Sequence, residues 1–276
     1  MGITIYIFIL ILLAAGVLLI THFGPAFVRI EKSGLSFFSQ KDTESLLPAS
    51  QVEMINKASS LYPLLNNKLK RRFERRLATF MTRKNFVASE GIDTITEEMK
   101  VIISAIFTQL TFGHPAQYLD MFKTVILRAD DYYSSRTGQY YEGEVNLIGC
   151  IVLSWKNLMA DLENESDGHN LGLHEAAHAL RLSYAFFEER ESDEMTKLIH
   201  EFDELAVQEM NNYETGNQTF FREYGAENYN EFFAVAIECY FEKPRQLFEY
   251  NPLIYNKLKQ ILKLDLLDPE HIIAKE

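Results

Sequence analysis

Two histidines four residues apart constrain this chain more than any other feature. They are His174 and His178 in the segment His-Glu-Ala-Ala-His-Ala-Leu. On an α-helix, residues at this spacing lie one above the other, so both imidazoles could reach a single metal ion. Glu175 lies about 100° around the helix, where its carboxylate could face a metal-bound water. The segment therefore predicts a metal-binding helix of the kind found in zinc hydrolases. The alternative is two histidines that are hydrogen-bonded within an ordinary helix.

A catalytic zinc ion needs a third protein ligand and an open position for water. Several acidic residues downstream could supply that ligand, and spacing alone leaves the choice open; they are Glu201, Asp203, Glu204, Glu227, Glu231 and Glu238. Glu231 also has a local alternative, because Asn228 followed three residues later by a glutamate resembles a capping pair. In that case its carboxylate would serve the backbone instead of a metal.

The periodicity of apolar residues changes twice along the chain. The periodicity is helical before residue 113. Within this part, Thr94 and Glu97 form a capping-box pattern, which predicts the start of a helix. Two short runs rich in Val, Ile and Leu then predict strands, at 124–127 and 148–155. We expect helices at 66–84, 99–110, 170–181, 192–212, 228–241 and 254–262. Helices, a few strands and then helices predict an α+β fold in a single domain.

The N-terminal segment from Ile3 to Ile20 is almost entirely apolar, and no charged residue precedes Arg29. As a helix it would span roughly 27 Å, close to the thickness of a hydrocarbon core. A cleaved signal peptide is the alternative, but no basic residue precedes the run. We therefore expect a transmembrane anchor at 1–23, a tether at 24–50 and one domain at 51–276. The first basic residues follow the anchor, which predicts a single-pass membrane protein with its domain in the cytoplasm.

Charge and cysteine content exclude some classes of protein. The net charge is −12, with 39 acidic and 27 basic residues, which argues against a nucleic-acid binder. Cys150 and Cys239 lie far apart and outside any ligand spacing, so we expect free thiols. Eight basic residues between Lys68 and Lys84 could rest on an anionic membrane surface, or they could line an ordinary solvated helix face.

Three separated segments resemble one known family. They are 224–244, with its Glu-Phe-Phe-Ala-Val sequence, Ile151-Val-Leu-Ser-Trp155, and the His-Glu-Ala-Ala-His-Ala-Leu segment. Together they resemble the Mlc titration factor A (MtfA-like) zinc peptidases, which are gluzincins, from about residue 62 to residue 262. The resemblance implies a zincin-like metallopeptidase domain with a small β-sheet, and it does not cover the predicted anchor. It also implies one Zn²⁺ per chain, with Glu231 as the third ligand.

The same resemblance bears on residues around the ligands. Tyr224 matches a family tyrosine, and its phenol could donate to the oxyanion that develops during hydrolysis. Glu238 lies two helical turns beyond Glu231 and could orient a ligand imidazole, or it could be a surface carboxylate. The chain departs from the family at Arg181, where an aspartate is usual, and at Tyr229, where proline is common. Arg181 places a cation near the metal-binding helix and could weaken zinc affinity.

The sequence thus predicts a membrane-anchored zinc metallopeptidase with a peptide or protein as its substrate. Glu175 would act as general base. The strand at 151–155 could present an edge to which an extended peptide adds, or it could be an interior strand of the core. The alternative is a membrane-tethered protein that sequesters a transcriptional regulator, with zinc structural or vestigial. The family name, which refers to titration of a repressor, suggests this alternative.

Overall fold

The computed structural model describes residues 47–114, 119–134, 138–164, 167–186, 193–217 and 219–273. The predicted anchor at 1–23 and nearly all of the predicted tether lie outside these residues. Within the described ranges, no helix has both the length and the apolar character that crossing a membrane requires.

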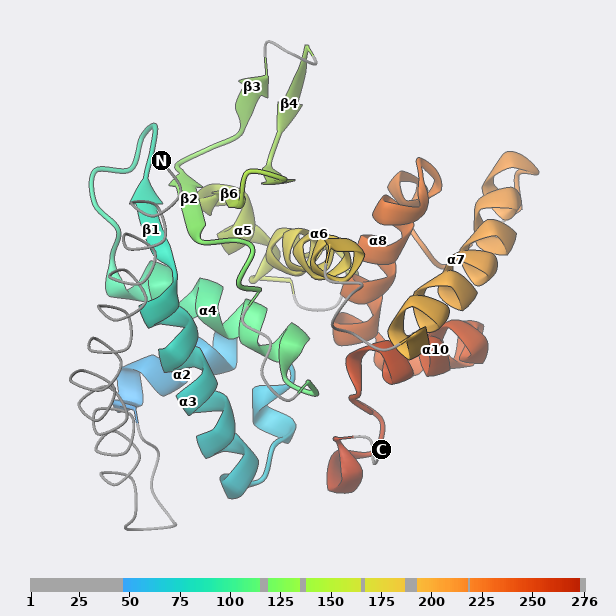
Figure 1. The fold of residues 1–276 in the computed structure, drawn as a ribbon, viewed down its shortest axis with the longest axis horizontal. Helices are drawn as coiled ribbons and strands as arrows, with labels where there is room; N and C mark the ends of the chain where they lie inside the picture. The colour runs from blue at the N-terminus through green and yellow to red at the C-terminus, as the bar shows by residue number, and fades with distance from the viewer. Residues whose placement is uncertain are drawn as a thin grey trace, which may run out of the picture. The chain divides into compact units, whose positions relative to one another are not determined.

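The first part of the domain is a group of helices beside the sheet (Figure 1). They are α2 (Ala49–Ala58), η1 (Tyr62–Leu64), α3 (Asn67–Arg83) and α4 (Glu97–Thr111). The hydroxyl of Thr96 accepts a hydrogen bond from the Met99 backbone N at 3.2 Å, so Thr96 begins α4. The prediction that Thr94 caps this helix was therefore wrong by two residues. With Thr96 as the cap, Glu97 and Glu98 lie in the first turn, where acidic side chains interact favourably with the helix dipole.

Four strands form the main sheet in the order β1-β2-β6-β5. Their bounds are β1 (Asn85–Ala88), β2 (Thr124–Arg128), β6 (Cys150–Ser154) and β5 (Gly143–Asn146). The first two pairings are parallel, whereas β5 pairs antiparallel with β6. The interpretation of 151–155 as an edge was therefore wrong, and the interior alternative is confirmed: Ile151 and Leu153 of β6 are fully buried, and β1 and β5 are the edge strands.

Two further strands, β3 (Tyr132–Ser134) and β4 (Gln139–Tyr141), form a separate antiparallel pair that projects away from the helices (Figure 1). The pair leads directly into β5, so its base lies next to the edge of the main sheet.

The rest of the described chain is helical. It comprises α5 (Trp155–Asp161), α6 (Leu171–Phe186), α7 (Asp193–Glu214), η2 (Glu223–Ala226), α8 (Tyr229–Glu242), α9 (Pro244–Tyr250), α10 (Pro252–Leu262) and η3 (Pro269–His271). Every helix predicted after residue 170 is present. The prediction missed α9, in which Pro244 stands in the first turn, where its missing N–H costs nothing. The α+β class is confirmed.

Helix α6 lies at the centre of the domain, between the sheet and α8 (Figure 1). Ala176, Ala177 and Ala179 are fully buried. A Cβ at Gly172 would lie 2.7 Å from Ile106 Cδ1, so the glycine allows α6 to approach α4 closely. Close packing on several sides holds α6 rigidly, which is what a precise site on its surface requires.

Part of the basic character of α3 is structural. The Arg76 guanidinium is buried and donates to the Thr111 carbonyl at 2.9 Å and the Phe112 carbonyl at 3.2 Å, at the C-terminus of α4. Lys84 Nζ donates to the Leu119 and Phe122 carbonyls at 2.7 Å each, and burial lowers its pKa to about 8. These two cations serve the interior, and no observation tests the predicted membrane contact of the others.

Candidate metal centre

Two side chains accept hydrogen bonds from the first backbone N–H groups of α6 and so fix the start of the helix. The Asn170 side-chain oxygen accepts from Leu173 N at 2.9 Å, and Asp161 Oδ2 accepts from Leu171 N at 2.7 Å. One turn further, His174 and Glu175 are 6% and 5% exposed, so both polar side chains are nearly withdrawn from solvent. Buried polar groups need specific partners, and those of His174 come from α8.

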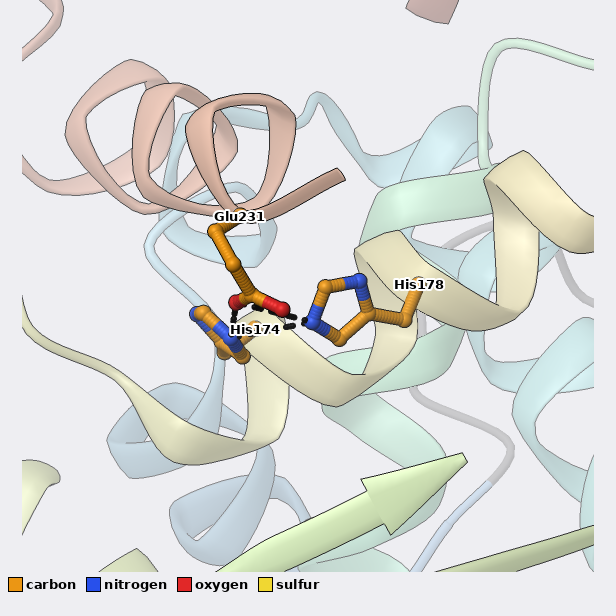
Figure 2. A group of neighbouring side chains, drawn as sticks. All are labelled: His174, His178 and Glu231. Carbon is orange, nitrogen blue, oxygen red and sulfur yellow. Dashed lines mark hydrogen bonds and ion pairs between the residues drawn. The ribbon is translucent and has the colours of Figure 1, made fainter. Parts of the chain in front are cut away.

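Helix α8 brings Glu231 to the two histidines (Figure 2). Asn228 caps this helix, with its side-chain oxygen accepting from Asn230 N and Glu231 N at 2.9 and 3.2 Å. Because the asparagine serves the backbone, the Glu231 carboxylate is free to point toward α6. Its Oε2 atom lies 3.0 Å from His174 Nε2 and 3.3 Å from His178 Nε2. The predicted residues therefore converge, and the backbone-capping alternative for Glu231 was wrong.

The spacing of these three atoms fits a zinc ion. His174 Nε2 and His178 Nε2 are 3.0 Å apart, so all three separations lie between 3.0 and 3.3 Å. Zinc–ligand bonds of about 2.0–2.1 Å in a tetrahedron place neighbouring ligand atoms about 3.3 Å apart. Two imidazoles and one carboxylate form a donor set that zinc favours, and a fourth position remains for water.

Glu238 holds the His174 ring from behind. It is fully buried, and its Oε1 lies 2.7 Å from His174 Nδ1, while its Oε2 accepts from Asn170 N at 2.7 Å. The Arg222 guanidinium donates to the same Oε1 at 2.6 Å and balances the buried charge. The surface-carboxylate alternative for Glu238 was wrong. Its contact fixes the ring so that Nε2, and not Nδ1, faces the other two donors.

The cluster attracts protons strongly when no metal ion competes for it. Burial lowers the pKa of His174, but hydrogen bonds to Glu231 and Glu238 outweigh burial and raise this pKa to about 10. Burial opposes ionisation of Glu231, but hydrogen bonds to His174 and His178 lower its pKa well below the usual range. Since a metal binds only the neutral imidazole, metal binding near neutral pH must release a proton.

Glu175 is buried against the edge strand β5. A Cβ at Gly143 would lie 2.7 Å from Glu175 Cγ and Oε1, so only glycine lets the strand approach this closely. Glu175 Oε2 is buried and makes no hydrogen bond to any described residue. Burial raises the pKa of this carboxyl. An unsatisfied carboxylate beside the three donor atoms is the arrangement that a general base requires.

Tyr224 lies beside the cluster and lines the same cavities as Glu175. It belongs to η2, is 43% exposed, and its ring centre lies 5.7 Å from that of His174. Burial, followed by the charge of Glu231, raises the pKa of its phenol above the ordinary value, so the hydroxyl keeps its proton at neutral pH. The phenol can therefore donate a hydrogen bond near the cluster.

The cluster opens into two adjoining cavities of about 740 and 250 Å³. Six residues line both: Tyr141, Gly143, His174, Glu175, Tyr224 and Glu231. The larger cavity continues along β4 toward His169 and Arg222, and the smaller one continues along β5 toward Arg181. Together they form space for an extended chain on both sides of the cluster.

Arg181, the departure noted in the sequence, has its own counter-charge. Its guanidinium donates to Asp203 of α7 at 2.7 Å and lies over the Phe233 ring, 5.5 Å from the ring centre. The ion pair with Asp203 offsets the positive charge of Arg181, which on the sequence alone could weaken zinc affinity. Asp203, one of the acidic residues that could have supplied a third ligand, pairs with Arg181 instead, and among the described residues only His174, His178 and Glu231 group around one point.

Comparison with known proteins places these residues in a family. The family model described as "Glucose-regulated metallo-peptidase M90" matches residues 38–263. The chain belongs to this metallo-peptidase family. The match confirms the resemblance drawn from the sequence, and it includes every residue of the cluster. Family membership implies a metallopeptidase type of function and a metal, typically zinc.

One similar protein of known sequence is the uncharacterized protein slr2042 of Synechocystis sp.. It is 26% identical over 242 residues, which cover 79% of this chain and 85% of that protein. The similarity therefore extends over most of both chains.

Sequence reasoning missed three residues that complete the site. Arg222 and Gly143 contact site residues that are distant in sequence, and Asp161 holds the start of α6. The sequence held a signal for Arg222, because Glu238 interrupts the otherwise apolar stretch 232–241. A carboxylate buried in such a stretch requires a cationic partner.

Proposed function

We propose that this chain is a zinc-dependent metallopeptidase, in which His174, His178 and Glu231 hold one Zn²⁺ ion. The observation that carries the proposal is the convergence of their three donor atoms beside the unpartnered carboxylate of Glu175. When bound, the ion supplies a Lewis acid that polarises the scissile carbonyl and lowers the pKa of a bound water toward neutrality.

The protein groups account for the proton transfers. Glu175 removes the proton of the attacking water and later delivers it to the leaving amine. Burial favours the protonated form of this carboxyl, which suits a group that must hold the proton between the two steps. Tyr224 retains its own proton and donates a hydrogen bond to the developing oxyanion.

The substrate backbone would pair with β5, and not with β6 as the sequence suggested. The outer side of β5 is unpaired within the described sheet, and Gly143 at its start lies against Glu175. An extended peptide added to this edge would pass directly over the base. Membrane anchoring by Ile3–Ile20, with the domain in the cytoplasm, is a second part of the proposal and rests on the sequence alone.

The test is the Glu175→Gln variant of the full chain. Because the amide of the substituted glutamine could not accept a proton, we expect this variant to keep zinc but to lose peptide cleavage by at least about 10³-fold. The wild-type chain should lose cleavage with a chelator and regain it on addition of zinc. Cleavage by the zinc-loaded variant at the wild-type rate would refute the proposed role of Glu175.

A further inference from the structure

The larger cavity carries charged groups beyond the metal cluster and the base. Four of them line its wall: Glu142, His169, Arg222 and Glu227. The mechanism assigns none of these a direct role in cleavage, so their balance of charge decides which substrate side chain the cavity can hold.

The two potentially cationic groups already have carboxylate partners. Arg222 pairs with the buried Glu238 at 2.6 Å, and His169 Nδ1 lies 3.0 Å from Asp161 Oδ1. A negatively charged substrate group would have to compete with these partners. The wall therefore offers little attraction for an acidic side chain.

Glu142 differs from them, because no hydrogen bond or ion pair joins its carboxylate to another described residue. The residue is exposed on the cavity wall and immediately precedes Gly143. Its backbone carbonyl accepts from Ser154 N at 2.7 Å, so its position on the edge of the sheet is fixed. Contact with the cavity wall partly desolvates this carboxyl and raises its pKa, and the charge of His169 opposes the rise.

A count of the charges around a bound zinc ion also indicates that the cavity keeps a net negative charge. The two positive charges of a bound zinc ion would be balanced by Glu231 and Glu175. The carboxylates of Glu142 and Glu227 remain, and Glu227 is exposed at the rim of the cavity. An apolar side chain bound here would desolvate the exposed Glu142 carboxylate without giving it a partner, which is unfavourable.

We propose that the larger cavity binds a lysine or arginine side chain of the peptide substrate, and that Glu142 is the residue that selects it. The aromatic rings of Tyr140 and Tyr141 line the same wall and can contact the methylene stem of such a side chain. This inference rests on the proposed peptidase function and adds the class of residue beside the cleaved bond.

The test uses the zinc-loaded full chain and fluorogenic peptides with an acetylated N-terminus. Each pair of peptides differs at one position near the cleaved bond, with lysine in one and the uncharged norleucine in the other. At the substrate position that the larger cavity binds, we expect kcat/KM to be at least about tenfold higher for the lysine peptide than for the norleucine peptide. The Glu142→Gln variant should reduce this ratio to near one, with norleucine cleavage within about twofold of wild type.

The matched control is Glu163→Gln, which removes an exposed carboxylate outside the cavity lining and should leave the lysine preference unchanged. A wild-type preference for norleucine, or a lysine preference that survives in Glu142→Gln, would overturn the inference while leaving the peptidase function intact. Cleavage that requires a free N-terminal amine, with no effect of lysine, would also overturn it. Failure of wild-type protein to cleave any peptide would instead refute the proposed function itself.

Discussion

Replacing Glu238 by glutamine should weaken both the fold and zinc binding. The fully buried carboxylate receives donors from Asn170, His174 and Arg222 at 2.6–2.7 Å. A glutamine can accept with only one of its two terminal atoms, so its amide must face a donor on the other side. The Arg222 side chain, 30% exposed, would also lose its counter-charge. Breaking a buried pair in this way costs about 3–5 kcal/mol.

The effect on zinc follows from the His174 ring. Without the carboxylate on Nδ1, the imidazole is less basic and less firmly oriented, and loss of such a contact weakens metal affinity by about 10–100-fold. Zinc affinity is measured by competition with a chromophoric chelator, and stability by denaturant unfolding of the metal-free chain.

Glu209→Gln provides a matched control for this variant. Glu209 is also buried, at 4% exposure, but it accepts from Tyr250 and Asn251, which are outside the metal cluster. This variant should be destabilised without a change in zinc affinity. If Glu238→Gln binds zinc within about twofold of wild type, the role assigned to Glu238 is wrong.

Three further predictions test other parts of the account. Gly143→Ala should reduce kcat by at least about tenfold while zinc stays bound, because the new Cβ displaces Glu175; unchanged kcat in a steady-state assay would contradict this contact. Tyr224→Phe should reduce kcat by about 10–100-fold with little change in KM, since the lost donor acts on the transition state; an effect confined to KM would contradict that role. For His114, burial lowers the folded-state pKa to about 4, so the unfolded chain binds this proton first as pH falls from about 6.5 to 4. Over that window the metal-free wild type should therefore lose about 3 kcal/mol more stability than His114→Gln, as measured by denaturant unfolding, and parallel stability curves would contradict the shift.

The sequence predicted the longer helices of this domain, because their apolar periodicity is strong and their ends carry recognisable signals, but it missed the shorter α2, α5 and α9. It missed the short strands β1, β3, β4 and β5. Of these, β5 has the sequence Gly-Glu-Val-Asn and only one apolar residue. An edge strand of this kind is stabilised by pairing with its neighbour, and such pairing leaves no periodic pattern. The wrong assignment of the edge to β6 followed from this omission.

The candidate site was predicted unevenly for a similar reason. His174, Glu175 and His178 lie on one helix, so their spacing alone indicated their geometry. Glu231 could be chosen among the acidic residues only through the family resemblance. The contact between Arg222 and Glu238 depends on how η2 packs beside α8, and packing between elements is not encoded in local spacing.

The most direct test of the central claim is the metal content of the purified full chain, measured by mass spectrometry beside the Glu231→Ala variant. The arrangement of the three donor atoms predicts one zinc per wild-type chain and loss of most of it in the variant, with both proteins folded by circular dichroism. Equal zinc content in the two proteins, or a wild-type chain that binds no zinc when it is supplied, would contradict the account.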